Sequence, residues 1–439
     1  MLYKICLVFI VFVSDVFAQN DSLQNVVYPV KVDSITIIGN EITEPEIILR
    51  ELTFKTGDIV TEENLEYNKD RIYSLGIFTR VDLLISVEDN FNKLIIYVEE
   101  SWYIYPIPFA ELKDKDWDKI SYGINLIIKN FRGRNETLRG RAAFGFDPSF
   151  HVEYYNPLLI PAENIFFGIN LFYLDSQNKS HIAELLYGKT FEQKFINGSI
   201  TLGKRFGLFH RLALFTTYNY IETPFYLKGI SASNGRIDRM PSLGLQYSYD
   251  TRDLAQFPRE GFFGIIKAEA KGLGVNDIKY MIYSLDLREY RKIYGSLGSK
   301  WRIASRTASG DDVPYYDYSY LGFNERIRGH YRAESEGNSY YLASAELNYP
   351  IVPDFNLSLD FIPIIPHELL SYRVALYFQI FADAGTTRLK GQKLSIGNFQ
   401  SGYGAGFTFL VLPYNLARLE IAFDEYKNME WIFDLGISF

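Results

Sequence analysis

The residues with the most evident chemistry in this 439-residue sequence are a few charged side chains among alternating apolar and polar residues. Arg328 lies in the stretch FNERIRGHYRAES, while Asp383 and Glu346 lie in FADAG and SAELNYP. The planar fork of an arginine can engage carboxylates through paired, charge-assisted hydrogen bonds. We therefore expect Arg328, with Gly329 beside it, to pair with Asp383 and Glu346. The alternative is a solvated Arg328 on a surface loop, where an ion pair contributes only ~0–1 kcal/mol.

From about Trp102 onward, apolar and polar residues alternate with a period of two in the segments that carry these residues, as in the C-terminal stretch EWIFDLGISF. One apolar and one polar face is typical of a strand between lipid and a wet interior. About sixteen such segments lie near 120–131, 136–147, 149–158, 163–175, 180–191, 195–207, 210–222, 239–250, 259–272, 276–291, 294–308, 339–351, 371–386, 399–412, 414–426 and 429–439. An even number of segments of at least ~9–11 residues predicts a transmembrane antiparallel β-barrel over residues 105–439. A soluble all-β protein is the alternative, but its core would leave the inward charges without water.

One connection of this barrel is long enough to have a function of its own. If the first strand runs outward, the loop 309–338 between the eleventh and twelfth strands is extracellular, and loops beyond ~12–15 residues are usually functional or disordered. In SGYGAGFTF, Gly402, Gly404 and Gly406 face the lumen and leave room for another segment. We therefore expect loop 309–338 to fold back into the barrel and to carry Arg328 with it.

The N-terminal region has a different pattern. Residues 1–18 predict a secretory signal peptide, with a basic start, a short apolar core and small residues before the cleavage site. Residues 28–101 predict a small α+β domain of order β-α-α-β-β. Thr43 and Thr61 are the expected N-caps of its two helices, and the last two strands are expected to meet at an Asp89-Asn90 turn.

The composition argues against several classes of function. The net charge is −8 without basic runs, so nucleic acid is not an expected partner. There is no H-E-x-x-H or G-x-S-x-G motif and the five histidines are scattered, so we expect no enzyme, no metal and no cofactor. Asp383 and Glu346 are conceivable as an acid–base pair, but inward charges in a barrel usually tune its lumen.

Five motifs, in order, resemble the BamA/TamA/FhaC superfamily of outer-membrane assembly and translocation proteins, of the bacterial surface antigen type. The domain 28–101, with GN after its first strand and LGIFTRV, resembles a single periplasmic POTRA domain. RIRGHY resembles the VRGF tip of the in-folded sixth loop, FADAG the F-x-D-x-G strand motif, and SAELNYP the Ser-x-Glu-Leu segment. YSYDTRDLAQFPREG resembles the mid-barrel turn, through Asp250, Arg252, Asp253, Pro258 and Gly261.

The resemblance has implications for the loop. In that family the loop arginine contacts strand carboxylates, which implies the same role for Arg328 with Asp383 and, less directly, Glu346. His330 takes the place of the aromatic residue after the glycine, with Tyr331 one place later. This difference leaves the packing of the loop tip open.

The resemblance also implies a function. It is the insertion of barrel proteins or the translocation of polypeptides, with client chains and the lipid of the bacterial outer membrane as partners. A POTRA sheet edge could accept a client strand by β-augmentation or bind a periplasmic partner. At the seam, the first strand, about Ser121 to Lys129, would meet Glu430 to Phe439, with Gly436 weakening the pairing and the terminal Phe439 resembling a barrel-insertion signal. The alternatives are a passive pore for small solutes and a two-partner secretion translocator, which carries two POTRA domains.

Overall fold

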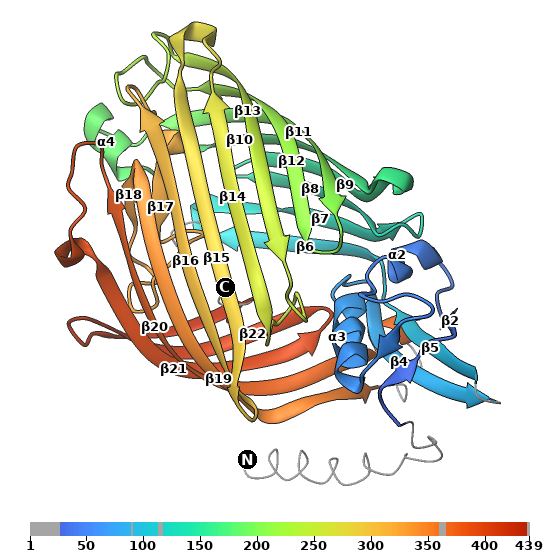
Figure 1. Ribbon diagram of the computed structural model, residues 1–439. Coiled ribbons are helices and arrows are strands. Elements are labelled where there is room, and N and C mark those ends of the chain that lie inside the picture. The colour runs from blue at the N-terminus through green and yellow to red at the C-terminus, as the bar shows by residue number, and fades with distance from the viewer. Residues whose placement is uncertain (1–26, 89–90, 113–116, 360–365, 437–439) are drawn as a thin grey trace.

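The computed structural model describes residues 27–88, 91–112, 117–359 and 366–436. They form a small N-terminal domain that lies against one end of a large curled sheet (Figure 1). The expected signal peptide, the Asp89-Asn90 turn and Phe439 lie outside the described residues. Within them, no helix has the length and apolar character needed to cross a bilayer.

The N-terminal domain keeps the predicted β-α-α-β-β order and adds two short strands, β1 and β3, that were not predicted. Its elements are β1 (Val30–Lys31), β2 (Ser34–Ile38), α2 (Pro45–Leu49), β3 (Ile59–Val60), α3 (Glu62–Tyr73), β4 (Phe78–Glu88) and β5 (Phe91–Glu100). The main sheet has the order β2-β5-β4, with β2 parallel to β5, and β1 pairs separately with β3. Thr61 caps α3 in a capping box with Asn64. Thr43 was expected to cap α2, but Glu44 is the N-cap, and the Thr43 hydroxyl donates to Glu100 instead.

The barrel sheet has sixteen strands in chain order, and every neighbouring pair is antiparallel, which confirms the predicted fold class. The strands are β6 (Ile104–Leu112), β7 (Ile120–Phe131), β8 (Glu136–Gly145), β9 (Ser149–Ile160), β10 (Ile165–Gln177), β11 (Glu192–Phe206), β12 (His210–Glu222), β13 (Ile237–Asp250), β14 (Gly261–Lys271), β15 (Tyr280–Tyr294), β16 (Leu297–Gly310), β19 (Ser339–Ser358), β20 (Ser371–Arg388), β21 (Gln400–Leu412), β22 (Asn415–Asp424) and β23 (Met429–Leu435). Alternate side chains along each strand face outward, and many of these are large, exposed apolar residues.

Two predictions about individual strands are wrong, and the two errors cancel in the number of strands. The segment 180–191 is not a strand; it contains helix α4 (His181–Tyr187), which Ser180 caps at its N-terminus and Gly188, at φ +83°, ends. The first strand, β6, was not predicted because it contains Pro106 and Pro108, which are rare inside sheets. The count therefore remains sixteen, and the long loop keeps its place after the eleventh strand.

The ends of the sheet also differ from the prediction. Residues 121–129 belong to β7, which has neighbours on both sides, so β6 and β23 are the terminal strands. No hydrogen-bonded register joins β6 to β23 among the described residues. Gly436 follows β23 instead of lying within it. Its φ of +124° ends the strand, and its N–H donates to Leu416 O at 2.9 Å.

One apolar core joins the two parts of the molecule. Buried residues of the N-terminal domain, such as Ile72 and Phe78, belong to the same cluster as Leu254, Phe257 and Tyr377 of the barrel. The N-terminal domain is therefore packed onto this end of the barrel, which we call the near end. The opposite end is the far end.

Candidate functional site

The long loop between β16 and β19, residues 311–338, leaves the barrel wall at the far end, and its tip contacts strands β19, β20 and β22. It begins two residues later than predicted. A short hairpin forms its stem, from β17 (Ser319–Leu321) and β18 (Ser335–Gly337). The side chain of Ile327, at the loop tip, is buried against Leu342 of β19. The tip that carries Arg328 follows directly.

Arg328 lies against the inner wall and contacts three carboxylates. Its Nε and Nη2 donate to Asp383 at 2.7 and 2.8 Å, and its backbone N–H donates to the same side chain at 3.1 Å. Its Nη1 donates to Glu346 and to Glu420, both at 3.1 Å. The guanidinium also lies 3.7 Å from the ring centre of Phe381. The structure thus brings Arg328, Asp383 and Glu346 together.

The charges around this contact are balanced, and some of them were not expected from the sequence. Lys300 is 3.4 Å from Glu346, and Arg418 is 3.3 Å from Glu420. The side chains of these four residues and of Arg328 are at most 6% exposed. Buried charges are stable only when they are paired and hydrogen-bonded. Glu420 was missed, although Arg418 and Glu420 alternate with Leu419 and Ile421 in LARLEIAF and could have been read as inward-facing.

The glycines that were expected to make room for the loop have different neighbours. A Cβ added at Gly402 would lie 1.6 Å from Arg328 O, so the loop backbone rests directly on this glycine. Gly329, at φ +99°, approaches Gly402 from the loop side, where its own Cβ would lie 3.0 Å from the Gly402 Cα. Gly404 leaves space for Phe381 and Gly406 for Glu420. Of these three glycines, Gly402 alone touches the loop tip.

The residues after Arg328 are held by the last two strands. Glu430 on β23 accepts hydrogen bonds from the backbone N–H groups of Gly329 and Tyr331, at 2.7 and 2.9 Å. His330 Nε2 lies 2.6 Å from Glu425 Oε2, in the turn between β22 and β23. The histidine that departs from the family pattern thus meets a carboxylate, and Tyr331 packs near Phe381.

The mid-barrel turn motif lies at the near end, against the N-terminal domain, and not at the loop. Asp250 accepts from Arg252 at 2.9 and 2.8 Å, and Asp253 accepts from the backbone and side chain of Arg259 at 2.9 and 3.1 Å. Gly261 has a φ of +109°, and a Cβ there would lie 2.4 Å from the carbonyl oxygen of Thr251. Pro258 lies in the same turn, between β13 and β14. These hydrogen bonds fix the shape of the turn, which contacts the N-terminal domain.

The turn docks through helix α3 of the N-terminal domain. Ser74 Oγ accepts from Ala255 N–H at 2.9 Å, and Gln256 Nε2 donates to Tyr73 O at 3.2 Å. Asp70 is almost fully buried, and its carboxylate receives Arg373 of β20 at 2.6 Å.

A second domain carboxylate, Glu51, is held in the same way. It pairs with Arg205 of β11 at 2.5 Å and with Arg71 of α3 at 2.8 Å. Asp70 and Glu51 therefore each link the N-terminal domain to the barrel wall. The described residues contain no group of three or more His, Cys, Asp or Glu side chains arranged to hold a metal.

Comparison with known proteins gives two family matches. Residues 130–439 match the Omp85 superfamily domain, and residues 30–101 match the POTRA family described as a surface antigen variable number repeat. No curated protein matches the chain in sequence.

Solved structures share the fold. BamA from Haemophilus ducreyi, lacking POTRA domains 1–3, superposes with a TM-score of 0.54 at 16% identity, over 93% of this chain and 84% of that one. CdiB from Escherichia coli superposes with a TM-score of 0.50 at 10% identity, over 96% of this chain and 93% of that one.

Proposed function

The chain belongs to the Omp85 superfamily, and we propose that it is a bacterial outer-membrane protein that assists the insertion of barrel proteins or the translocation of polypeptides. In this proposal the POTRA repeat lies in the periplasm. The near end of the barrel is then the periplasmic end, and the long loop starts on the cell surface.

The observation that carries this proposal is the clamp at the tip of the in-folded loop. Arg328 is held by Asp383, Glu346 and Glu420, and the loop backbone lies against Gly402. A pore for small solutes needs an open lumen and has no evident use for a POTRA domain. A buried, charge-balanced clamp instead fixes one loop against strands β19 to β22, close to the last strand of the sheet.

The POTRA repeat is the proposed receiver of clients. Strands β2 and β4 form the two edges of its three-stranded sheet. An edge strand presents backbone N–H and C=O groups that an extended polypeptide can pair with. We propose that a client strand adds to one of these edges before it reaches the barrel.

Depletion of the protein, followed by quantitative comparison of the outer-membrane and secreted proteomes, tests the proposal. Loss of barrel proteins indicates insertion, and loss of secreted polypeptides indicates translocation. Unchanged proteomes with reduced uptake of small solutes would overturn the proposal in favour of a pore.

Complementation of the depleted cells makes the test specific to the clamp. Arg328→Gln is expected to fail to restore the lost proteins. Arg326→Gln is the matched control, because Arg326 is an exposed arginine two residues away in the same loop. Equal rescue by both variants would show that the clamp is not needed for the function.

A further inference from the structure

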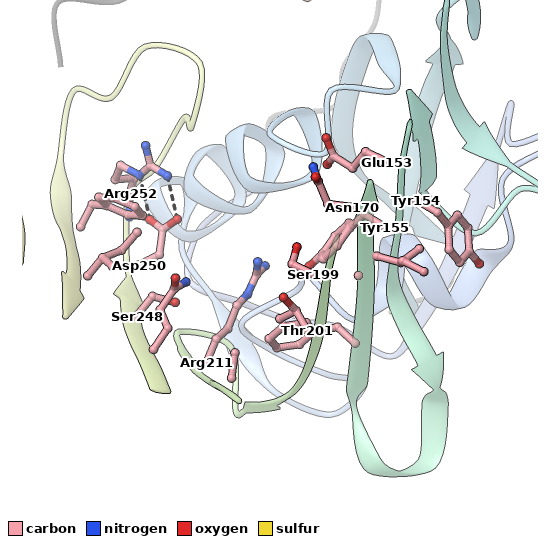
Figure 2. Close-up of a pocket in the computed structure, with 17 residues that line it drawn as sticks. Glu153, Tyr154, Tyr155, Asn170, Ser199, Thr201, Arg211, Ser248, Asp250 and Arg252 are labelled. Atoms are coloured by element: carbon pink, nitrogen blue, oxygen red, sulfur yellow. Dashed lines mark hydrogen bonds and ion pairs between the residues drawn. The ribbon is translucent and has the colours of Figure 1, made fainter. Parts of the chain in front are cut away.

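A cavity of about 560 Å³ opens from the inner wall of the barrel at the near end, far from the loop clamp. It lies on strands β9 to β14 and is lined by hydroxyl, amide and aromatic side chains together with a few charges (Figure 2). Figure 2 shows the guanidinium of Arg211 between Ser248 on one side and Ser199 and Thr201 on the other. The lining also holds Arg252, Asp250 and Glu153. Arg252 pairs with Asp250 at 2.8 Å, and Glu153 pairs with Arg139 at 3.3 Å. Among the described lining residues, Arg211 is therefore the cation without a close carboxylate partner.

Arg211 has no carboxylate of its own. Within the described part of the chain its guanidinium forms no ion pair and no hydrogen bond, and it interacts with Asp250 only at longer range. Asp250 is already held on two sides by Arg252. The residue directly opposite Arg211 on β11 is Arg205, whose partner is Glu51 of the N-terminal domain. Like charges directly opposite each other destabilise a sheet.

The surroundings extend this excess of positive charge. A second cavity, of about 120 Å³, adjoins Arg211 at the junction with the N-terminal domain. Its charged lining comprises four arginines and two carboxylates, namely Arg71, Arg205, Arg211, Arg252, Glu51 and Asp250.

Arg50, in the N-terminal domain, lies close enough to be affected by the same positive charges. Burial, together with the charges of Arg205 and Arg211, lowers the pKa of Arg50. Its Nε is buried and has no hydrogen-bond acceptor among the described residues. Five guanidinium groups, those of Arg50 and of the four arginines of the second cavity, share the two carboxylates of Glu51 and Asp250. This excess of positive charge departs from the charge balance seen at the loop clamp. Such departures are expected at functional sites.

We propose that the Arg211 cavity is a binding site for an oxyanion, a phosphate or carboxylate group. The guanidinium of Arg211 would provide the charge-assisted hydrogen bonds, and the hydroxyls of Ser248, Ser199 and Thr201 would provide neutral ones. The anion would also offset the repulsion between Arg211 and Arg205. This site goes beyond the proposed function. Anion binding can be measured on the purified protein without any client, so the two proposals can fail separately.

Isothermal titration of the purified full-length protein in zwitterionic detergent with inorganic phosphate, at constant ionic strength, tests the site. We expect saturable binding of one phosphate per chain. Arg211→Gln should weaken it at least tenfold, about 1.4 kcal/mol, and Arg211→Lys by less. Lys204→Gln is the matched control, because Lys204 is a nearby β11 cation on the outer face, beside Arg205. Absence of saturable binding to wild type, or equal binding by wild type and Arg211→Gln, would overturn the proposal.

A second variant keeps the test valid if Arg211→Gln does not fold. Ser248 is directly opposite Arg211 in the register of β12 and β13. Ser248→Asp should supply the missing carboxylate, abolish phosphate binding and raise the unfolding midpoint, whereas Ser248→Asn should do neither. Phosphate binding by Ser248→Asp equal to that by Ser248→Asn would contradict the proposal.

A competition experiment identifies the natural carrier of the anion. A short peptide with one glutamate and an amidated C-terminus is added to the phosphate-loaded protein, and its glutamine counterpart, also amidated, serves as control. Displacement by the glutamate peptide alone supports a site for polypeptide carboxylates. No displacement by either peptide supports a site for a free oxyanion. Displacement by both peptides alike would contradict a charge-based site.

Discussion

Replacing Arg328 by glutamine should destabilise the barrel through one particular carboxylate. Asp383 has Arg328 as its only ion-pair partner among the described residues, whereas Glu346 keeps Lys300 and Glu420 keeps Arg418. Breaking a buried pair by removing one partner typically costs ~3–5 kcal/mol, because a charge is left uncompensated. We expect a loss in the free energy of unfolding in this range for Arg328→Gln.

The reverse substitution should be milder. Asp383→Asn leaves Arg328 with two carboxylates and retains one hydrogen-bond acceptor, so a loss of ~1–3 kcal/mol is expected. In the double variant, Arg328→Gln with Asp383→Asn, no carboxylate of the clamp is left unpaired. The losses in unfolding free energy of the two single variants should therefore not add. We expect a coupling energy of about 2 kcal/mol, within the range of ~0.5–3 kcal/mol seen for residues in contact.

Denaturant unfolding of the purified variants in micelles measures these free energies, and protease access to the loop in intact cells reports whether its tip stays inside. Losses that add to within ~0.5 kcal/mol would refute the reasoning, as would equal protease resistance of the wild-type and Arg328→Gln loops. Arg328→Glu combined with Asp383→Arg should recover only part of the stability. In that variant the new glutamate still faces Glu346 and Glu420.

Two further substitutions test other contacts. Asp70→Asn should loosen the N-terminal domain, because Arg259 and Arg373 of the barrel lose the carboxylate that this domain supplies and keep only barrel partners such as Asp354; faster protease cleavage between domain and barrel is expected, and an unchanged cleavage rate would contradict the proposed link. Gly402→Ala should displace the loop tip, because the added Cβ would lie 1.6 Å from Arg328 O; loop cleavage should rise as in Arg328→Gln, and a fully protected loop would show that the backbone contact is not needed.

Much of the barrel and of the clamp was predictable from local patterns. Alternation places Asp383 and Glu346 on inward faces, and an inward charge requires a partner of opposite sign. Gly402 could be identified in the same way, since a glycine on an inward face leaves space for a second segment.

The errors arose where two physical signals compete. The segment at α4 is as long and as apolar as a strand, but Ser180 and Gly188 bracket it as a helix. The docking of the N-terminal domain was not predicted, because its contacts join residues far apart in sequence. Asp70 and Arg373 are an example, and neither has a local pattern that names its partner.

The two prolines of β6 have a consequence for the outer margin of the barrel wall. The N–H of Lys129 donates to Tyr103 O, so the odd-numbered residues that follow on β6 exchange bonds with β7. Pro106 and Pro108 therefore turn their backbone nitrogens toward the side of β6 on which no described strand is bonded. A proline nitrogen has nothing to donate. Any strand that pairs with this edge of β6 finds carbonyl acceptors but no N–H donors at positions 106 and 108. Such a strand therefore forms fewer backbone hydrogen bonds with β6 and can be released more easily.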